Sequence, residues 1–179
     1  MNQTGATLLE LLTTLAVAAI LVSLAVPGFA FVSQTNRLAG ATNDLVAALH
    51  LTRSEAIKRN GRAVLCASDN GTACRSVSWD RGWIVFHDAN NNAVLDADEP
   101  VVLRQAAMPA GVSATGNQFV SRYVSYTPTG SAQTVSGFRQ AGTFTICSAG
   151  NGAPRQAREI VLATTGRVRT TKLTLASCP

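Results

Sequence analysis

Apolar residues are concentrated near the start of the chain. The stretch from Leu11 to Phe31 contains no charged residue and consists largely of Leu, Ala, Val and Ile. Its length of about 20 residues, at about 1.5 Å of rise per residue, is enough to cross a hydrocarbon core of about 30 Å. The pattern therefore predicts a transmembrane helix over residues 6–31.

The residues before this stretch differ from the start of a secretory signal peptide. Such a peptide has a basic region before its apolar segment and a small-residue cleavage site after it, whereas residues 1–10 contain neither Lys nor Arg. Glu10 stands at the head of the apolar stretch, and no Lys or Arg occurs before Arg37. A carboxylate left in hydrocarbon costs about 2–3 kcal/mol, so Glu10 requires a partner.

The pattern changes after Phe31 to that of an amphipathic helix. No Pro occurs from Gln34 to Asn60, and apolar or small residues recur at spacings of three and four: Leu38, Ala41, Leu45, Ala48, Leu49, Thr52 and Ala56. This spacing places them on one helix face, and Asn60-Gly61 supplies a stop signal. Residues 32–61 are therefore expected to continue the first segment as one long bent helix.

Beyond Gly61 the sequence breaks into short β-type runs separated by Gly, Asn and Pro. The expected strands are 62–66, 83–86, 101–103, 119–126, 142–147, 159–163 and 168–175, and the turn signals fall at 70–71, 109–111, 128–130 and 151–152. Short turns of this kind connect antiparallel hairpins. We therefore expect an α+β fold, in which a β-rich head over residues 62–179 packs on the second half of the long helix.

Composition restricts the class of protein further. The chain has 179 residues, of which 46% are hydrophobic and 14% charged. This composition is sufficient for a hydrophobic core and excludes a disordered, highly charged segment. Its net charge of +5 is unevenly distributed, because residues 120–179 hold seven basic residues and one acid, Glu159. The basicity belongs to the last third of the chain.

No catalytic signature is present. The chain has two histidines, His50 within the long helix and His87 beside Asp88, and it lacks the G-x-S-x-G, G-x-x-x-x-G-K and H-E-x-x-H motifs. Hydrolase, nucleotide-binding and zinc-protease functions therefore lack their usual residues. We expect a protein that is not an enzyme and that carries no cofactor.

The N-terminal residues resemble a known processing motif. Gly5 followed by Ala6-Thr7-Leu8-Leu9-Glu10 is similar to the prepilin cleavage site of type IV pilins and type II secretion pseudopilins, and Pro27 resembles the helix-kinking proline of type IV pilins. The resemblance implies that a prepilin peptidase removes the leader 1–5 and that the new terminus at Ala6 is methylated. It also implies that Glu10 pairs with the terminal amine of a neighbouring subunit.

The end of the long helix narrows this resemblance. Residues 51–60, with the sequence LTRSEAIKRN, are similar to the helix end of the GspH/FimT family of minor pilins and pseudopilins. The resemblance implies a type IV pilin-like fold, other pilin subunits as partners, and a single-pass protein of the inner membrane. Its head would lie in the periplasm, or outside the cell once the subunit is assembled in a pilus.

Four cysteines occur at Cys66, Cys74, Cys147 and Cys178. No C-x-x-C pair or nearby His suggests zinc or redox chemistry, and an oxidising location allows disulfides. The two local pairings, Cys66 with Cys74 and Cys147 with Cys178, are favoured, although sequence alone permits three connectivities.

One segment has the spacing of a calcium loop. Its oxygen-bearing residues occupy positions 1, 3, 5, 9 and 12 of that loop: Asp88, Asn90, Asn92, Asp96 and Glu99. Position 6 is Ala93 instead of the usual Gly, and the flanking residues are expected to be strands. The segment therefore predicts either a Ca²⁺ site or an Asn/Asp-rich hairpin tip.

The last third contains a possible DNA-binding segment. A strand through Gly166-Arg167-Val168-Arg169 would turn both arginines to one face and Val168 to the core, and guanidinium groups suit phosphate oxygens. The segment also resembles the C-terminal G-R-x-R motif through which some members of the family bind DNA in natural transformation. Further candidate DNA-binding residues are Lys172, Arg155 and Arg158.

Two functions remain open for this segment. The first is a minor pilin that binds double-stranded DNA, with phosphate contacts and no base stacking, because aromatic residues are sparse there. The second is a purely structural or priming subunit of a type IV pilus or of a type II secretion pseudopilus. In that case the arginines are solvated charges that protect an edge strand from aggregation.

Overall fold

The structure is a computed structural model that describes residues 7–148 and 155–179, without the side chains of residues 24, 26, 27 and 30. A single helix, α1 (Leu8–Lys58), opens the chain, which divides into two compact units at Asn36. The predicted leader, the cleavage site between Gly5 and Ala6, and the turn at 151–152 lie outside the described residues.

In the first unit, Thr7 and Glu10 cap the start of α1. The backbone N–H of Thr7 donates to Glu10 Oε2 and the N–H of Glu10 donates to Thr7 Oγ1, each at 3.3 Å. This reciprocal arrangement is a capping box, in which two otherwise unpaired backbone donors find acceptors. Glu10 therefore has a local partner in Thr7, at the start of its own helix.

The predicted helix over residues 6–31 is confirmed from Leu8 onward, and its backbone stays helical through Pro27. Many of its apolar side chains are exposed, among them Leu8, Leu9, Leu15, Ile20, Leu21 and Phe29. The membrane-spanning assignment is not confirmed: within the described part of the chain, no helix is both long enough and apolar enough to cross a membrane.

The helix ends as a Schellman motif at Asn60. Asn60 has a left-handed φ of 47°, and the Gly61 N–H donates to the Ala56 carbonyl at 3.1 Å. The Asn60 N–H donates to the Ile57 carbonyl at 3.2 Å, which completes the pattern. The predicted stop is therefore confirmed, with Asn60 instead of Gly61 in the left-handed conformation.

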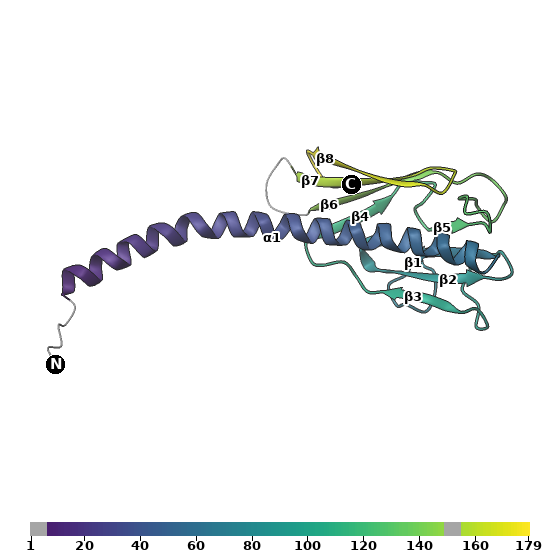
Figure 1. Cartoon of the computed structure of the whole chain (residues 1–179), viewed down its shortest axis with the longest axis horizontal. Coiled ribbons are helices and arrows are strands. Elements are labelled where there is room, and N and C mark those ends of the chain that lie inside the picture. Colours follow the sequence, from purple (N-terminus) through teal and green to yellow (C-terminus); the bar gives the residue numbers. More distant parts are fainter. Residues whose placement is uncertain (1–6, 149–154) are drawn as a thin grey trace. The chain divides into compact units, whose positions relative to one another are not determined.

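The second unit combines the rest of α1 with two antiparallel four-stranded sheets (Figure 1). The first sheet has the order β3-β2-β1-β5, with β1 (Arg62–Ala67), β2 (Trp83–Asp88), β3 (Val101–Gln105) and β5 (Tyr123–Tyr126). The second has the order β4-β6-β7-β8, with β4 (Val112–Gly116), β6 (Gly142–Ser148), β7 (Arg155–Leu162) and β8 (Val168–Leu175). A short 3₁₀ helix, η1 (Trp79–Arg81), precedes β2.

Both sheets and the helix share one hydrophobic core. Its buried side chains include Leu38, Leu45 and Leu49 of α1, Leu65 and Val85 of the first sheet, and Phe144, Ile146 and Ile160 of the second. Trp79 of η1 meets Phe144 edge to face at 5.2 Å and donates its indole N–H to the Val120 carbonyl at 2.9 Å. The predicted helix face is thus the face on which the β-rich head packs.

The strands differ from the sequence expectation at three places. β4 was not predicted, residues 119–122 do not belong to a strand, and β7 begins at Arg155 instead of Glu159. The α+β fold class, the antiparallel pairing and the remaining strand positions are confirmed.

Candidate functional site

The five predicted DNA-binding residues all belong to the hairpin of β7 and β8. Arg155 and Arg158 lie in β7, Arg169 and Lys172 lie in β8, and Arg167 is in the connection just before β8. β8 pairs only with β7 and forms the edge of the second sheet. The hairpin therefore gathers basic residues that are up to seventeen positions apart in the sequence at one exposed edge.

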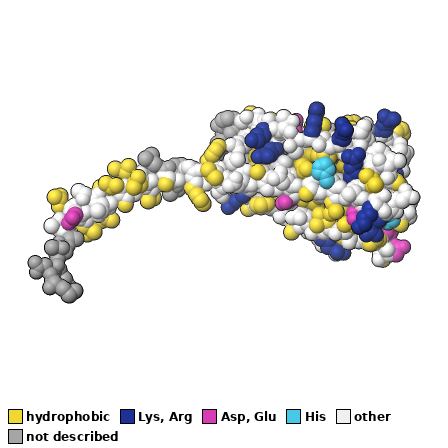
Figure 2. All heavy atoms as spheres, viewed as in Figure 1, with side chains coloured by type: hydrophobic (Ala, Val, Ile, Leu, Met, Phe, Trp, Pro, Cys, Tyr) yellow, Lys and Arg dark blue, Asp and Glu magenta, His cyan; other side chains and the backbone are white. Residues whose placement is uncertain are grey.

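The side chains at this edge have no partners within the described residues. Arg167, Arg169 and Lys172 are exposed, and Arg155 and Arg158 are half-buried. None of the five side chains makes a hydrogen bond or ion pair in residues 7–148 and 155–179, where the ion pairs involve Lys58, Arg59 and Arg75. Basic side chains gather along the edge over β7 and β8 in Figure 2, with little acidic surface between them.

Strand register decides which of these residues share a face. Residues directly opposite each other in an antiparallel pair lie on the same side of a sheet, and Lys172 is opposite Arg158 while Arg169 is opposite Val161. Arg169 and Lys172 are three residues apart, so they lie on opposite faces of β8. Both residues are nevertheless exposed at this edge strand.

The predicted placement of Val168 is correct, whereas that of Arg167 differs in part. Val168 packs against the core, as the period-two pattern requires. Arg167 precedes the strand, and its carbonyl accepts a hydrogen bond from the Ala163 N–H at 2.9 Å across the tight turn between β7 and β8. The turn itself therefore determines where Arg167 is placed.

That turn is held from two directions. The Arg53 Nη2 of α1 donates to the Thr165 carbonyl at 3.3 Å, and the Ala132 N–H donates to the Thr164 carbonyl at 3.1 Å. Gly166 has a φ of +78°, and a Cβ added there would come within 2.1 Å of the Gly130 carbonyl oxygen. The glycine of the G-R-x-R segment is thus required by close backbone packing.

Arg53 also lies beside a buried tyrosine. Both Arg53 Nε and the Tyr126 hydroxyl are buried and have no hydrogen-bond partner in the described part of the chain. Burial raises the pKa of the Tyr126 hydroxyl well above its usual range, an effect that the Arg53 guanidinium partly opposes. Tyr126 therefore stays neutral beside the cation at physiological pH.

Both predicted disulfides are present. Cys147–Cys178 has a Cα–Cα distance of 5.7 Å and links β6 to the segment after β8, so it anchors the end of the basic hairpin. Cys66–Cys74, with a Cα–Cα distance of 5.5 Å, closes a small loop after β1. Among the described residues no cysteine is free.

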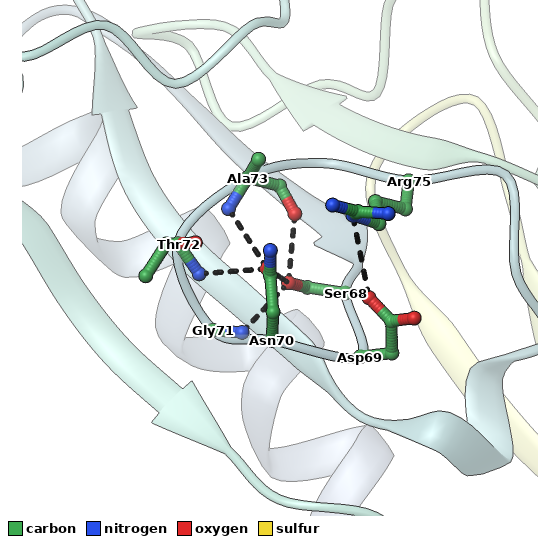
Figure 3. A network of polar contacts seen from close by, with 7 residues as sticks. All are labelled: Ser68, Asp69, Asn70, Gly71, Thr72, Ala73 and Arg75. Atoms are coloured by element: carbon green, nitrogen blue, oxygen red, sulfur yellow. Dashed lines mark hydrogen bonds and ion pairs between the residues drawn. The ribbon is translucent and has the colours of Figure 1, made fainter.

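The loop closed by Cys66–Cys74 is internally hydrogen-bonded (Figure 3). Asn70 Oδ1 accepts from the backbone N–H groups of Thr72 and Ala73 at 3.0 and 3.2 Å, and Ser68 Oγ donates to the Ala73 carbonyl at 2.7 Å. Asp69 pairs with Arg75 at 3.4 Å. These contacts give the turn at Asn70-Gly71 a structural role.

The calcium prediction for Asp88, Asn90, Asn92, Asp96 and Glu99 is not supported. The two oxygens of Asp88 accept from the Asn92 and Ala93 N–H groups at 3.0 Å, and Glu99 accepts from the Ala89 and Asp96 N–H groups at 2.8 and 3.2 Å.

Asp96 accepts from the side-chain amides of Asn90 and Asn92 at 2.8 and 2.9 Å. No cluster of three or more His, Cys, Asp or Glu residues placed to hold a metal is found among the described residues. The loop closes on its own backbone donors and amide groups, and it corresponds to the hairpin-tip alternative.

Comparison with known proteins defines the family. Residues 41–166 match the sequence model described as "Type II transport protein GspH". No curated protein sequence matches the chain. The match ends at Gly166, so Arg167, Arg169 and Lys172 lie beyond it.

Two solved structures resemble the fold, both crystal forms of the type IV minor pilin FimU of Pseudomonas aeruginosa strain PAO1. The first is 20% identical, with 78% of this chain and 91% of FimU covered and a TM-score of 0.57. The second is 19% identical, with 75% and 92% covered and a TM-score of 0.51. The chain therefore has the fold of a type IV minor pilin and belongs to the GspH family, whose members are structural subunits and not enzymes.

Proposed function

We propose that this minor pilin-type subunit binds double-stranded DNA through the β7–β8 hairpin and serves DNA uptake in natural transformation. The observation that carries the proposal is the placement of Arg167 and Arg169 at an exposed sheet edge, where neither side chain has a partner within the described residues. No ion pair has to be broken before these guanidinium groups contact phosphate. Arginine is well suited to that contact because it offers two parallel N–H donors.

The supports of the hairpin favour binding by a rigid surface. The hydrogen bond from Arg53 to Thr165, the close approach of Gly166 to Gly130, and the Cys147–Cys178 disulfide fix both ends of the segment. Less conformational entropy is lost when prearranged groups bind. Contacts limited to the phosphate backbone carry no base information, so different DNA sequences should bind with similar affinity.

The test uses the full-length protein in a non-ionic detergent, because apolar side chains of α1 are exposed. Fluorescence anisotropy with a labelled duplex is measured over a series of salt concentrations. The variant replaces both arginines, Arg167→Gln and Arg169→Gln. The matched control, Arg37→Gln with Arg81→Gln, removes the same charge from two exposed arginines outside the hairpin.

We expect the hairpin variant to bind more weakly and to flatten the slope of log K against log salt by up to about 1.8, since each neutralised phosphate releases about 0.9 counterion. The control should keep the wild-type slope. If the two variants have equal slopes, the assignment of the hairpin is wrong. If wild type does not bind the duplex at low salt, the purely structural function remains.

A second observation favours an assembly function, with or without DNA. The first half of α1 exposes many large apolar side chains, which other pilin subunits would cover in a filament. We propose cleavage after Gly5 by a prepilin peptidase, methylation of Ala6, and pairing of Glu10 with the terminal amine of a neighbour. The two disulfides favour an oxidising location for the head, as in the periplasm or outside the cell.

Intact-mass measurement of protein from filaments tests the processing. The expected mass lacks residues 1–5 and includes one methyl group, whereas retention of Met1 would refute the cleavage. Replacement of Glu10 by Gln should reduce incorporation into filaments. Replacement of Thr7 by Val serves as the control, because it removes a contact of the capping box and keeps the carboxylate.

A further inference from the structure

A second group of basic residues lies outside the β7–β8 hairpin. Arg122 and Arg139 line a pocket of about 400 Å³ together with Phe119, Tyr123, Phe138 and Gln140. The pocket is formed by the segment before β5 and the segment between β5 and β6. Its volume is in the range of pockets that hold small organic ligands.

The pocket combines aromatic rings with free positive charge. Phe119 and Phe138 are 60% and 74% exposed, which is unusual for such large apolar side chains. The side chains of Arg122 and Arg139 are exposed and make no hydrogen bond or ion pair with any part of the chain that the structure describes. No acidic residue lines the pocket. Its surface therefore complements a ligand that is both planar and anionic.

The walls of the pocket are fixed by buried Gln140. Its Nε2 donates to the carbonyls of Phe119 and Tyr123 at 2.9 and 2.8 Å, and its Oε1 accepts from the Ser125 N–H at 3.1 Å. The Phe138 N–H donates to Thr134 Oγ1 at 3.1 Å, and the Phe138 carbonyl accepts from the Thr134 N–H at 2.8 Å. The two aromatic segments are thus held in place before any ligand arrives.

These same hydrogen bonds occupy the backbone groups beside the rings. An extended peptide that binds along a protein surface usually pairs with free backbone donors and acceptors, and the carbonyls of Phe119, Tyr123 and Phe138 already have donors. What the pocket offers is the faces of aromatic rings and two guanidinium groups. Proteins that bind single-stranded nucleic acid use this combination, with bases stacked on rings and phosphates held by cations.

We propose that this pocket binds single-stranded DNA, with an unpaired base against Phe119 and Phe138 and the adjoining phosphates on Arg122 and Arg139. Bases within a duplex are stacked on one another and cannot enter the pocket. The site is therefore selective for single strands. It shares no residue with the β7–β8 hairpin, so it does not depend on the duplex binding proposed above.

The experiment measures binding of the full-length protein in detergent to a fluorescein-labelled strand of eight deoxythymidines. A DNA hairpin with a fully paired stem provides the duplex arm. The variant replaces Phe119 and Phe138 by Ala, and the matched control, Phe31→Ala, removes an exposed ring from α1. A third variant, Phe138→Trp, keeps an aromatic surface in the pocket, and circular dichroism melting of each variant confirms the fold.

We expect the double Phe variant to raise the Kd for the single strand at least about fivefold. Removal of an aromatic side chain on which a base stacks weakens binding by about that factor or more. Its duplex affinity should change less than twofold. Phe31→Ala and Phe138→Trp should bind the single strand like wild type. The variant with Arg122→Gln and Arg139→Gln should flatten the single-strand salt slope by about 1.4, from about 0.7 counterion per phosphate.

Three results would overturn the proposal. The first is a single-strand Kd that the folded double Phe variant leaves unchanged. The second is equal affinity for thymidine monophosphate and for the eight-residue strand, which would make the site a pocket for free nucleotides. The third is a double Phe variant that binds a peptide of alternating Asp and Phe more weakly than wild type but binds DNA as wild type does. That result would make the pocket a protein-docking site. Loss of duplex binding in the Arg167 and Arg169 variant bears only on the hairpin.

Discussion

Gly166 provides a quantitative test of how the basic hairpin is built. Replacement by Ala places a side chain on a residue with a φ of +78°, a left-handed conformation that costs an L-residue about 1–2 kcal/mol. The new Cβ would also lie 2.1 Å from the Gly130 carbonyl oxygen, which belongs to backbone and cannot rotate away. Relief of that contact requires the turn to separate from the loop after β5.

This separation would stretch the hydrogen bonds from Arg53 to Thr165 and from Ala132 to Thr164. Loss of one such bond costs about 1 kcal/mol, so the total destabilisation should be about 3–4 kcal/mol. At about 2–4 °C per kcal/mol for a chain of this size, the melting temperature should fall by about 6–16 °C.

Gly111 is the matched control for this prediction. It has a φ of +84°, and a Cβ added there has no heavy atom within 4 Å. Gly111→Ala should therefore cost only the conformational strain, about 1–2 kcal/mol. Differential scanning calorimetry gives the melting temperature of each variant, and the difference between the two reports the cost of the contact with Gly130. If both variants melt at the same temperature, the close approach of the two turns is not present, and the argument for a rigid hairpin fails.

Three further predictions concern stability. Replacing both Cys147 and Cys178 by Ala should lower the free energy of unfolding by about 3–4 kcal/mol, measured with urea, because the disulfide closes a sequence separation of 31 residues. A chelator should leave the melting temperature unchanged, since the carboxylates of Asp88, Asp96 and Glu99 already accept hydrogen bonds from within the loop; a clear decrease would restore the calcium site. A hydrogen bond from Arg59 lowers the pKa of Glu55 below its usual range. The stability that Glu55 contributes is therefore present above the usual pKa of a glutamate and is lost as the pH falls through the lowered pKa. The stability difference between wild type and Glu55→Gln, followed by urea titration from pH 7 to pH 2, should therefore vanish at the acidic end, and a difference independent of pH would contradict the assignment.

The fold was largely predictable because its main signals are local. The spacing from Leu38 to Ala56 determines the buried helix face, and alternation within β6 and β8 marks strands without knowledge of their partners. β4 was missed because Val112–Gly116 is short and consists mainly of small and polar residues. Residues 119–122 have the composition of a strand, but the backbone there turns, with Phe119 exposed. Pairing partners, which sequence does not display, decided both cases.

The sites were less predictable because they depend on register and hydrogen-bond direction. The spacing of Asp88, Asp96 and Glu99 is visible in the sequence, but the donors that satisfy their carboxylates become apparent only when the loop folds. The opposite faces of Arg169 and Lys172 follow directly from strand parity. The need for glycine at position 166 could not be foreseen, because Gly130 is 36 positions away in the sequence.

The basic excess of the last third turns out to consist of two groups with different chemistry. Arg167 and Arg169 stand on an open edge without aromatic neighbours in their segment, so they can contact phosphates and cannot distinguish single strands from duplex. Arg122 and Arg139 flank the rings of a pocket, and only an unpaired base can contact those rings. A subunit with both surfaces could hold a duplex along the hairpin and an exposed single-stranded end in the pocket. Charge alone does not separate these two modes. Loss of the rings should weaken binding of single strands and leave duplex binding intact, whereas loss of the hairpin arginines should weaken binding of both.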